Sequence, residues 1–219
     1  MDVIIPIFPS NECKYRERNL EYVSSLYSSV VFGECNDSVW RKGLAVRDGL
    51  EKATSEYVLV SDSDIVIPGF SLPEEFDVVR LGKWVYRLTE EATIDFIQGR
   101  LTLEEVKSER RLLVEEPNLQ VLGGGALPIK RKIGLEYPMD IRFYGWGKQD
   151  IAWGILLRNF FKVTRLELDM VHLWHPPQER VARYVGNEHN EKLVRRYFDA
   201  QRDREKFSEI LKEIKSPLK

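Results

Sequence analysis

Apolar and polar residues alternate with two distinct periods along the first sixty residues. Short apolar runs rich in valine and isoleucine are typical of strands, and between them apolar residues recur every three or four positions, as in amphipathic helices. Asp37 or Ser38 can cap the second of these helices. The order strand, helix, strand, helix, strand predicts a right-handed parallel βαβαβ unit and hence the α/β class. We expect the strands at 3–8, 30–32 and 57–60, and the helices at 15–29 and 39–52.

The second half of the chain is patterned less regularly. Apolar residues from Leu193 to Ile214 recur at spacings of three and four, interrupted by Arg204, which predicts one amphipathic helix within 187–216, packed on the domain. We find no internal repeat and no low-complexity linker, so one domain covering 1–219 is the economical interpretation. We expect short strands at 76–81, 84–88, 119–122, 126–129, 162–166 and 168–172, and helices at 103–113 and 150–160.

Composition and charge narrow the class of partner. The 219 residues are 31% charged and 43% hydrophobic, and a net charge of −2 gives no basic field for nucleic acid. No apolar stretch approaches the roughly 20 residues that span a bilayer, so we expect no transmembrane segment. With only Cys13 and Cys35, and without the pattern of a secretory signal, we expect a cytoplasmic location. Composition leaves the oligomeric state open.

Two carboxylates follow the third predicted strand. The apolar run at 57–60 is succeeded by Ser61, Asp62, Ser63 and Asp64. Two carboxylates separated by one residue ionise together most readily beside a cation. The carboxyl ends of the strands are also where ligands bind in open α/β sheets. The pattern therefore predicts a cation and ligand site, although a solvated turn rich in Asp and Ser has the same composition.

A glycine-rich segment and a tryptophan-containing loop follow. Three successive glycines at 123–125 allow a backbone to approach a ligand closely, or form a plain turn. In the loop at 144–150, glycines on either side of Trp146 leave room for a flat sugar against the indole. Asp150 lies at the start of the next predicted helix, where its carboxylate can accept a proton.

Histidines and basic residues supply further candidates. His172 and His175, two of the three histidines, lie at the end of a predicted strand, and imidazole is a good ligand for divalent metals. They could instead be packed histidines with satisfied hydrogen bonds. Arg41, Lys42 or Arg47 could meet a phosphate, although basic residues on a helix are more often simply exposed.

The order of these motifs resembles that of the GT-A-type, metal-dependent nucleotide-sugar glycosyltransferases. Asp-x-Asp at 62–64 resembles their metal and nucleotide-sugar site, and 123–150 resembles the galactosyltransferase-type half, where a glycine-rich strand end precedes Trp-Gly-x-Glu-Asp. Gln149 stands where that family usually has Glu, which leaves the acceptor in doubt. The resemblance covers about 1–180 and implies a single Rossmann-like GT-A domain with a mixed, mainly parallel sheet flanked by helices.

The same resemblance implies parts and roles. Residues 1–70 would bind the nucleotide, 119–180 the acceptor and metal, and 187–216 would form the C-terminal helix. The reaction would transfer a sugar, with inversion, from a nucleotide diphosphate donor, most often a UDP-sugar, to a glycan, lipid-linked or protein-linked acceptor. Asp150 would be the catalytic base, and Asp64 with His172 or His175 would hold Mn²⁺ or Mg²⁺. The acceptor would contact Tyr144, Trp146 and Gln149, and the donor would contact Pro6, Phe8, Glu34, Asp37, Arg47, Asp62, Ser63, Gly124 and Gly125.

Three alternatives stay open. A nucleotidyltransferase on a related sheet also needs acidic metal ligands, but normally has a glycine-rich, basic loop after the first strand, which residues 6–11 are not. A catalytically silent carbohydrate-binding or scaffold protein could keep the fold without the reaction. A retaining transferase is a further possibility, since Asp150 could orient the acceptor instead of acting as the base.

Overall fold

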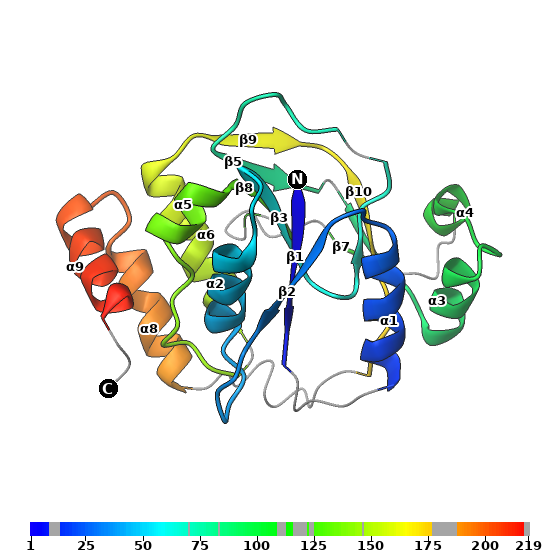
Figure 1. Cartoon of the computed structure of the whole chain (residues 1–219), viewed down its shortest axis with the longest axis horizontal. Helices are drawn as coiled ribbons and strands as arrows, with labels where there is room; N and C mark the ends of the chain where they lie inside the picture. Colours follow the sequence, from blue (N-terminus) through cyan, green and yellow to red (C-terminus); the bar gives the residue numbers. More distant parts are fainter. Residues whose placement is uncertain are drawn as a thin grey trace.

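A six-stranded sheet forms the centre of the molecule in the computed structural model (Figure 1). The strand order is β2 (Val30–Glu34), β1 (Asp2–Ile7), β3 (Tyr57–Ser61), β8 (Ala126–Lys130), β5 (Val78–Leu81) and β9 (Val163–Leu166). The structure describes residues 1–8, 14–69, 71–82, 84–108, 113–115 (backbone only), 122, 125–145, 147–176 and 188–216.

The first three strands confirm the predicted parallel unit. β1 pairs in parallel with both β2 and β3, and β5 pairs in parallel with β9. β8 runs antiparallel to its neighbours β3 and β5. The sheet is therefore mixed but mainly parallel, as expected for the α/β class.

A second sheet of four strands was not expected. Its order is β4 (Ile65–Val66), β10 (Asp169–His172), β6 (Trp84–Arg87) and β7 (Leu113–Glu115). β10 pairs antiparallel with β4, and His172 lies opposite Ile65. The two-residue strand β4 directly follows Asp64, so this pairing places the end of β10 next to the Asp-x-Asp segment.

Helices cover both faces of the central sheet (Figure 1). On one side lie α2 (Lys42–Lys52), α5 (Arg131–Glu136) and α6 (Gln149–Phe160), with α8 (Glu188–Asp199) and α9 (Arg204–Lys215) outside them. On the other side lie α1 (Lys14–Ser25), α3 (Glu90–Ile97) and α4 (Leu103–Ser108). No helix in the described part of the chain is long and apolar enough to cross a membrane.

Alternate residues of the central strands enter two separate cores. In β1, Ile4 packs on the side of α2 and α6, whereas Val3 and Ile5 pack on the side of α1 and the second sheet. β3 alternates in the same way, because successive side chains of a strand point to opposite faces. A strand covered on both faces needs apolar residues at every position, which explains the uninterrupted runs at 3–5 and 58–60.

Several predicted helix limits were wrong. The helix expected at 39–52 begins at Lys42, and Asp37 does not cap it: this carboxylate instead accepts from Arg41 and from Ser38. Of the helix expected at 103–113, the structure describes α4 over Leu103–Ser108, whereas Leu113 belongs to the strand β7, and α3 was missed. Within the strand expected at 119–122, only residue 122 is described.

The C-terminal amphipathic segment forms two helices where one was expected. α8 ends at Asp199, and Arg202 adopts a left-handed conformation with a φ of 69°. Asp203 then caps α9 by accepting hydrogen bonds from the backbone N–H groups of Glu205 and Lys206. Both helices place apolar residues in the core shared with α6, and the one interruption in the apolar spacing, Arg204, is the first residue of α9.

Candidate active site

The carboxyl end of β3 and the beginning of β8 form the floor of the candidate site. The N–H of Asp62 donates to the carbonyl of Gly125 at 2.7 Å. Gly125 has a φ of +96°, and a Cβ there would lie 2.6 Å from Cγ1 of Ile65 and 3.2 Å from Oδ2 of Asp62. Glycine is therefore required for this close approach. Gly124, which was expected beside it, lies outside the described residues.

A buried lysine forms ion pairs with two aspartates that have different predicted roles, one in donor binding and one as the base. Nζ of Lys42, in the first turn of α2, lies 2.7 Å from Oδ1 of Asp62 and 3.0 Å from Oδ1 of Asp150. Only 10% of the Lys42 side chain is exposed. Burial alone would lower the pKa of Lys42, but the Asp150 and Asp62 carboxylates outweigh it and raise this pKa above its usual range. Lys42 is therefore a fixed positive charge between α2, β3 and α6.

Asp62 ionises less readily than an ordinary aspartate. Loss of hydration raises its pKa, Lys42 lowers it, and the nearby Asp150 and Asp64 carboxylates raise it further, to about 6. Two carboxylates thus share one ammonium group in the pocket that also contains Met139 and Trp153, and Asp64 is near enough to affect Asp62. Ser63 lies in the turn between Asp62 and Asp64.

Asp64, His172 and His175 form a separate cluster beside this group. Oδ2 of Asp64 lies 3.8 Å from Nε2 of His172 and 3.2 Å from Nε2 of His175. The N–H of Leu173 donates to the carbonyl of Asp64 at 2.8 Å, which fixes the end of β10 against β4. One ligand atom from each of the three side chains lies within 4.8 Å of the others, close enough to hold one metal ion.

The electrostatics of this cluster suit a divalent cation. Burial alone would raise the pKa of Asp64, but His172 and His175 lower it below its usual range. Burial lowers the pKa of His172, which favours the neutral imidazole that binds metals, whereas the hydrogen bond to Asp64 raises the pKa of His175. The sequence left open which histidine would be a ligand, and the structure places both beside Asp64.

A loop with left-handed backbone precedes α6. Gly145, Gly147 and Lys148 have φ values of 66°, 94° and 76°, and the N–H of Gly145 donates to the carbonyl of Trp40 at 2.7 Å. Asp150 then lies in the first turn of α6 with 44% of its side chain exposed. The loop therefore determines where Asp150 points. Trp146, expected to meet the acceptor, lies outside the described residues.

The two other residues expected to meet the acceptor differ in position. The Tyr144 ring lies 5.2 Å from the His189 ring and 5.5 Å from the Arg41 guanidinium, in a partly exposed position. Gln149 is only 4% exposed, and its amide donates to the carbonyl of Gly145. The structure thus places Gln149 beneath the loop, where it supports the backbone and is hidden from an acceptor.

Four of the nine residues predicted to bind the donor lie at the ends of the first two strands. Pro6 pairs with Gly33 in β2, and the Phe8 ring lies 5.7 Å from that of Trp40. The N–H of Glu34 donates to Asp48 at 2.8 Å, and Asp37 pairs with Arg41 at 2.6 Å. Arg47 is not brought to the site: it is half exposed on α2 and pairs with Glu51.

Comparisons with known proteins identify the fold. No protein-family model matches the sequence, and no curated protein matches it significantly. The structure is similar to glucosyl-3-phosphoglycerate synthase from Mycobacterium tuberculosis in complex with Mn²⁺, UDP-glucose and phosphoglyceric acid. That similarity has a TM-score of 0.52 and 15% identity, and covers 91% of this chain and 78% of the synthase. The chain has the GT-A fold.

A second group of similar structures is more distant. The catalytic domain of Drosophila β1,4-galactosyltransferase 7 in complex with xylobiose has a TM-score of 0.49 and 13% identity over 75% of this chain. This chain spans only 63% of the length of that galactosyltransferase structure. The similarity to the synthase shows the GT-A fold alone, and the reaction must be argued from the side chains described above.

Proposed function

We propose that this chain is a metal-dependent glycosyltransferase that transfers a sugar from a nucleotide diphosphate donor, a UDP-sugar, to an acceptor hydroxyl. One observation supports this most directly. The cluster of Asp64, His172 and His175 lies at the same sheet edge as the group formed by Lys42, Asp62 and Asp150. A cation site next to a partly exposed carboxylate can stabilise a diphosphate leaving group and accept the proton of an acceptor hydroxyl.

The donor set fits Mn²⁺ or Mg²⁺. Asp64 contributes a carboxylate oxygen, and His172 and His175 contribute imidazole nitrogens, within 4.8 Å of one another. A divalent cation held there would neutralise the charge that develops on the diphosphate leaving group. The similar synthase structures contain UDP with Mn²⁺ or Mg²⁺, which supports the same class of donor and cation here.

Asp150 would act as the base. Its carboxylate would accept the proton of the acceptor hydroxyl while that oxygen bonds to the anomeric carbon and the bond to the diphosphate breaks, which gives inversion. One carboxylate oxygen accepts from Lys42, and 44% of the side chain is exposed, so the group is oriented and still reachable. Lys42 would hold Asp150 in place through this ion pair, because the ammonium group is itself buried and held by Asp62.

The remaining parts of the proposal concern the two substrates. Residues 1–70 would bind the nucleotide between the ends of β1 and β2, with Pro6, Phe8, Glu34 and Asp37 nearest to it. The part at 119–180 would hold the metal and the acceptor, with Tyr144 at the entrance. The acceptor would be a glycan, free or attached to a lipid or protein.

Calorimetry and an assay of turnover test the proposal together. UDP should bind more tightly with Mn²⁺ than in chelator, and a panel of UDP-sugars should show hydrolysis or transfer only with the metal. Proton NMR of the product would give its anomeric configuration, and retention would refute Asp150 as an inverting base. Release of pyrophosphate from a nucleoside triphosphate would indicate a nucleotidyltransferase. UDP affinity that is equal in Mn²⁺ and in chelator would contradict the cation assignment.

A further inference from the structure

The first turn of α8 contacts the loop that leads to Asp150. Asn190 is fully buried, and its side-chain oxygen accepts from the N–H of Tyr144 at 3.4 Å. Its side-chain amide donates to the carbonyl of Tyr144 at 2.9 Å and to that of Gly147 at 3.2 Å. A single carboxamide therefore binds the loop backbone on both sides of residue 146.

The neighbours of Asn190 contact the same loop. His189 packs its ring 5.2 Å from the ring of Tyr144 and bonds the carbonyl of Arg142 at 3.1 Å. Glu191 pairs with Lys148 at 2.8 Å. Three successive residues of α8 thus hold the segment from 142 to 148, which neither sheet includes.

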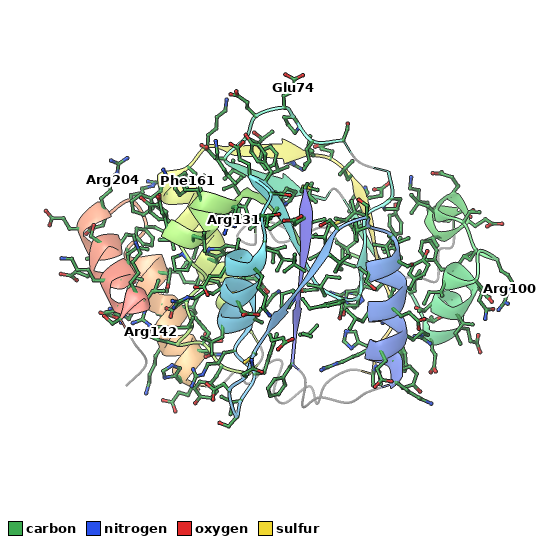
Figure 2. The ribbon with its side chains drawn as sticks, in the orientation of Figure 1. Glu74, Arg100, Arg131, Arg142, Phe161 and Arg204 are labelled. Atoms are coloured by element: carbon green, nitrogen blue, oxygen red, sulfur yellow. The ribbon has the colours of Figure 1, made fainter. Side chains whose placement is uncertain are left out.

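An ion-pair network anchors the beginning of this segment to the same two helices. The buried Asp140 accepts from Arg142 and from the hydroxyl of Tyr197 in α8, at 2.7 and 2.8 Å. Arg142 also pairs with Glu213 of α9, which in turn pairs with Arg196 of α8. Figure 2 shows Arg142 beside α8. This network holds the loop at Arg142, and Asn190 holds it at Tyr144 and Gly147.

The loop needs such support because of its backbone. Gly145, Gly147 and Lys148 all have positive φ values, and for Lys148 this conformation is unfavourable unless surrounding contacts hold it. Asp150 follows Lys148 by two residues, so any rotation of the loop moves the carboxylate. A displacement of about 1 Å at a reacting group can cost on the order of 10²-fold in rate.

We propose that Asn190 is a positioning residue for the transfer reaction, so that α8 supports the acceptor site through the loop it contacts. Its carboxamide sets the turn at 144–147, and the turn sets Tyr144 and Asp150 relative to the donor. This inference rests on the proposed function. It assigns no contact between Asn190 and either substrate, because the side chain is fully buried.

Asn190→Asp tests the inference at nearly constant shape. The carboxylate keeps an acceptor for the N–H of Tyr144, but loses the two donors and faces the carbonyls of Tyr144 and Gly147. We expect kcat for transfer to fall by on the order of 10²-fold while UDP affinity in Mn²⁺ stays within about 3-fold of wild type. Hydrogen exchange of peptides covering 142–150 should accelerate selectively. Lys192→Gln is the matched control, because it removes only an exposed ion pair with Glu188 on the same helix, away from the loop, and should leave kcat unchanged.

A second variant keeps the test decisive if Asn190→Asp fails to fold. His189 is exposed, so His189→Ala should fold, and we expect it to raise the KM for acceptor several-fold with UDP affinity unchanged. Wild-type kcat and wild-type exchange in Asn190→Asp would overturn the inference. Parallel loss of UDP affinity and transfer in a folded variant would also overturn it, because that indicates a purely structural role. If the wild type transfers no sugar, the proposed function fails, whereas the exchange data still decide whether Asn190 holds the loop.

Discussion

Replacing Lys42 with methionine should destabilise the protein because it leaves two carboxylates without their shared cation. Lys42 is the ammonium between Asp62 and Asp150, at 2.7 and 3.0 Å, and methionine keeps much of its length without the charge. Removing one partner of a fully buried ion pair costs roughly 3–5 kcal/mol, and of a surface pair roughly 0–1 kcal/mol. The Lys42 side chain is 10% exposed but the two carboxylates are 36% and 44% exposed, so solvent screens part of the loss. We expect the free energy of unfolding to fall by about 2 kcal/mol at pH 8.

The loss should depend on pH in a defined direction. In the folded protein the pKa of Asp62 is about 6, above the ordinary 3.8, so folding becomes less favourable as this carboxyl ionises between those values. Without Lys42 the charged form is still less favourable, and the folded pKa of Asp62 should rise further. The difference in stability between wild type and Lys42→Met should therefore be larger at pH 8 than at pH 5.

Urea denaturation at both pH values is the measurement. Lys52→Met serves as control, since Lys52 lies on the same helix but pairs with Asp48 at the surface, and its loss should leave stability nearly unchanged. If Lys42→Met were as stable as wild type at pH 8, the central ion pairs would be unimportant. An equal loss at both pH values would show that the effect arises from packing and not from the carboxylates.

The other predictions concern the cation site, the base and the floor of the site. Asp64→Ala should abolish the strengthening of UDP binding by Mn²⁺ in calorimetry, and His172→Ala or His175→Ala should reduce it; full metal dependence in all three variants would contradict the ligand set. Asp150→Asn should keep UDP affinity but slow single-turnover transfer by on the order of 10²- to 10⁴-fold, and a near-normal rate would place the base elsewhere. Gly125→Ala should lower the melting temperature, because a Cβ would lie 2.6 Å from Ile65 at a φ of +96°. An unchanged melting temperature would show that β8 can shift.

The sequence predicted the fold where local pattern and burial coincide. The runs that form β1 and β3 are apolar at every position because both faces of the sheet are covered, so their type and order could be inferred without the structure. The break between α8 and α9 was not predicted, because Arg204 is a single interruption in an apolar spacing that resumes in phase at Phe207. The second sheet was missed for another reason: β4 has two residues and is defined by its partner β10.

In the candidate site too, residues with a local sequence signal were predicted, and residues placed by long-range packing were not. The resemblance to GT-A enzymes placed Asp64 with His172 or His175, and the structure brings both imidazoles beside Asp64. Lys42 was no more than one of three basic residues near a helix start, and nothing in its local sequence indicates a buried ammonium. Asn190 was not considered at all, because its role depends on how α8 packs against a loop more than 40 residues earlier. Contacts made by single polar side chains across the fold leave no periodic signal in the sequence.

The balance of charge in the site gives a physical reason for the proposed cation. Asp62, Asp64 and Asp150 contribute three carboxylates, and Lys42 is the ammonium that contacts two of them. Lys42 pairs with Asp62 and with the proposed base Asp150, whereas Asp64 faces two imidazoles, of which His172 has a lowered pKa. A diphosphate arriving beside Asp64 would bring further negative charge to that side, where Lys42 is already engaged. Under the proposed function, the site therefore separates two tasks: a fixed lysine orients the base, and an exchangeable cation compensates the leaving group.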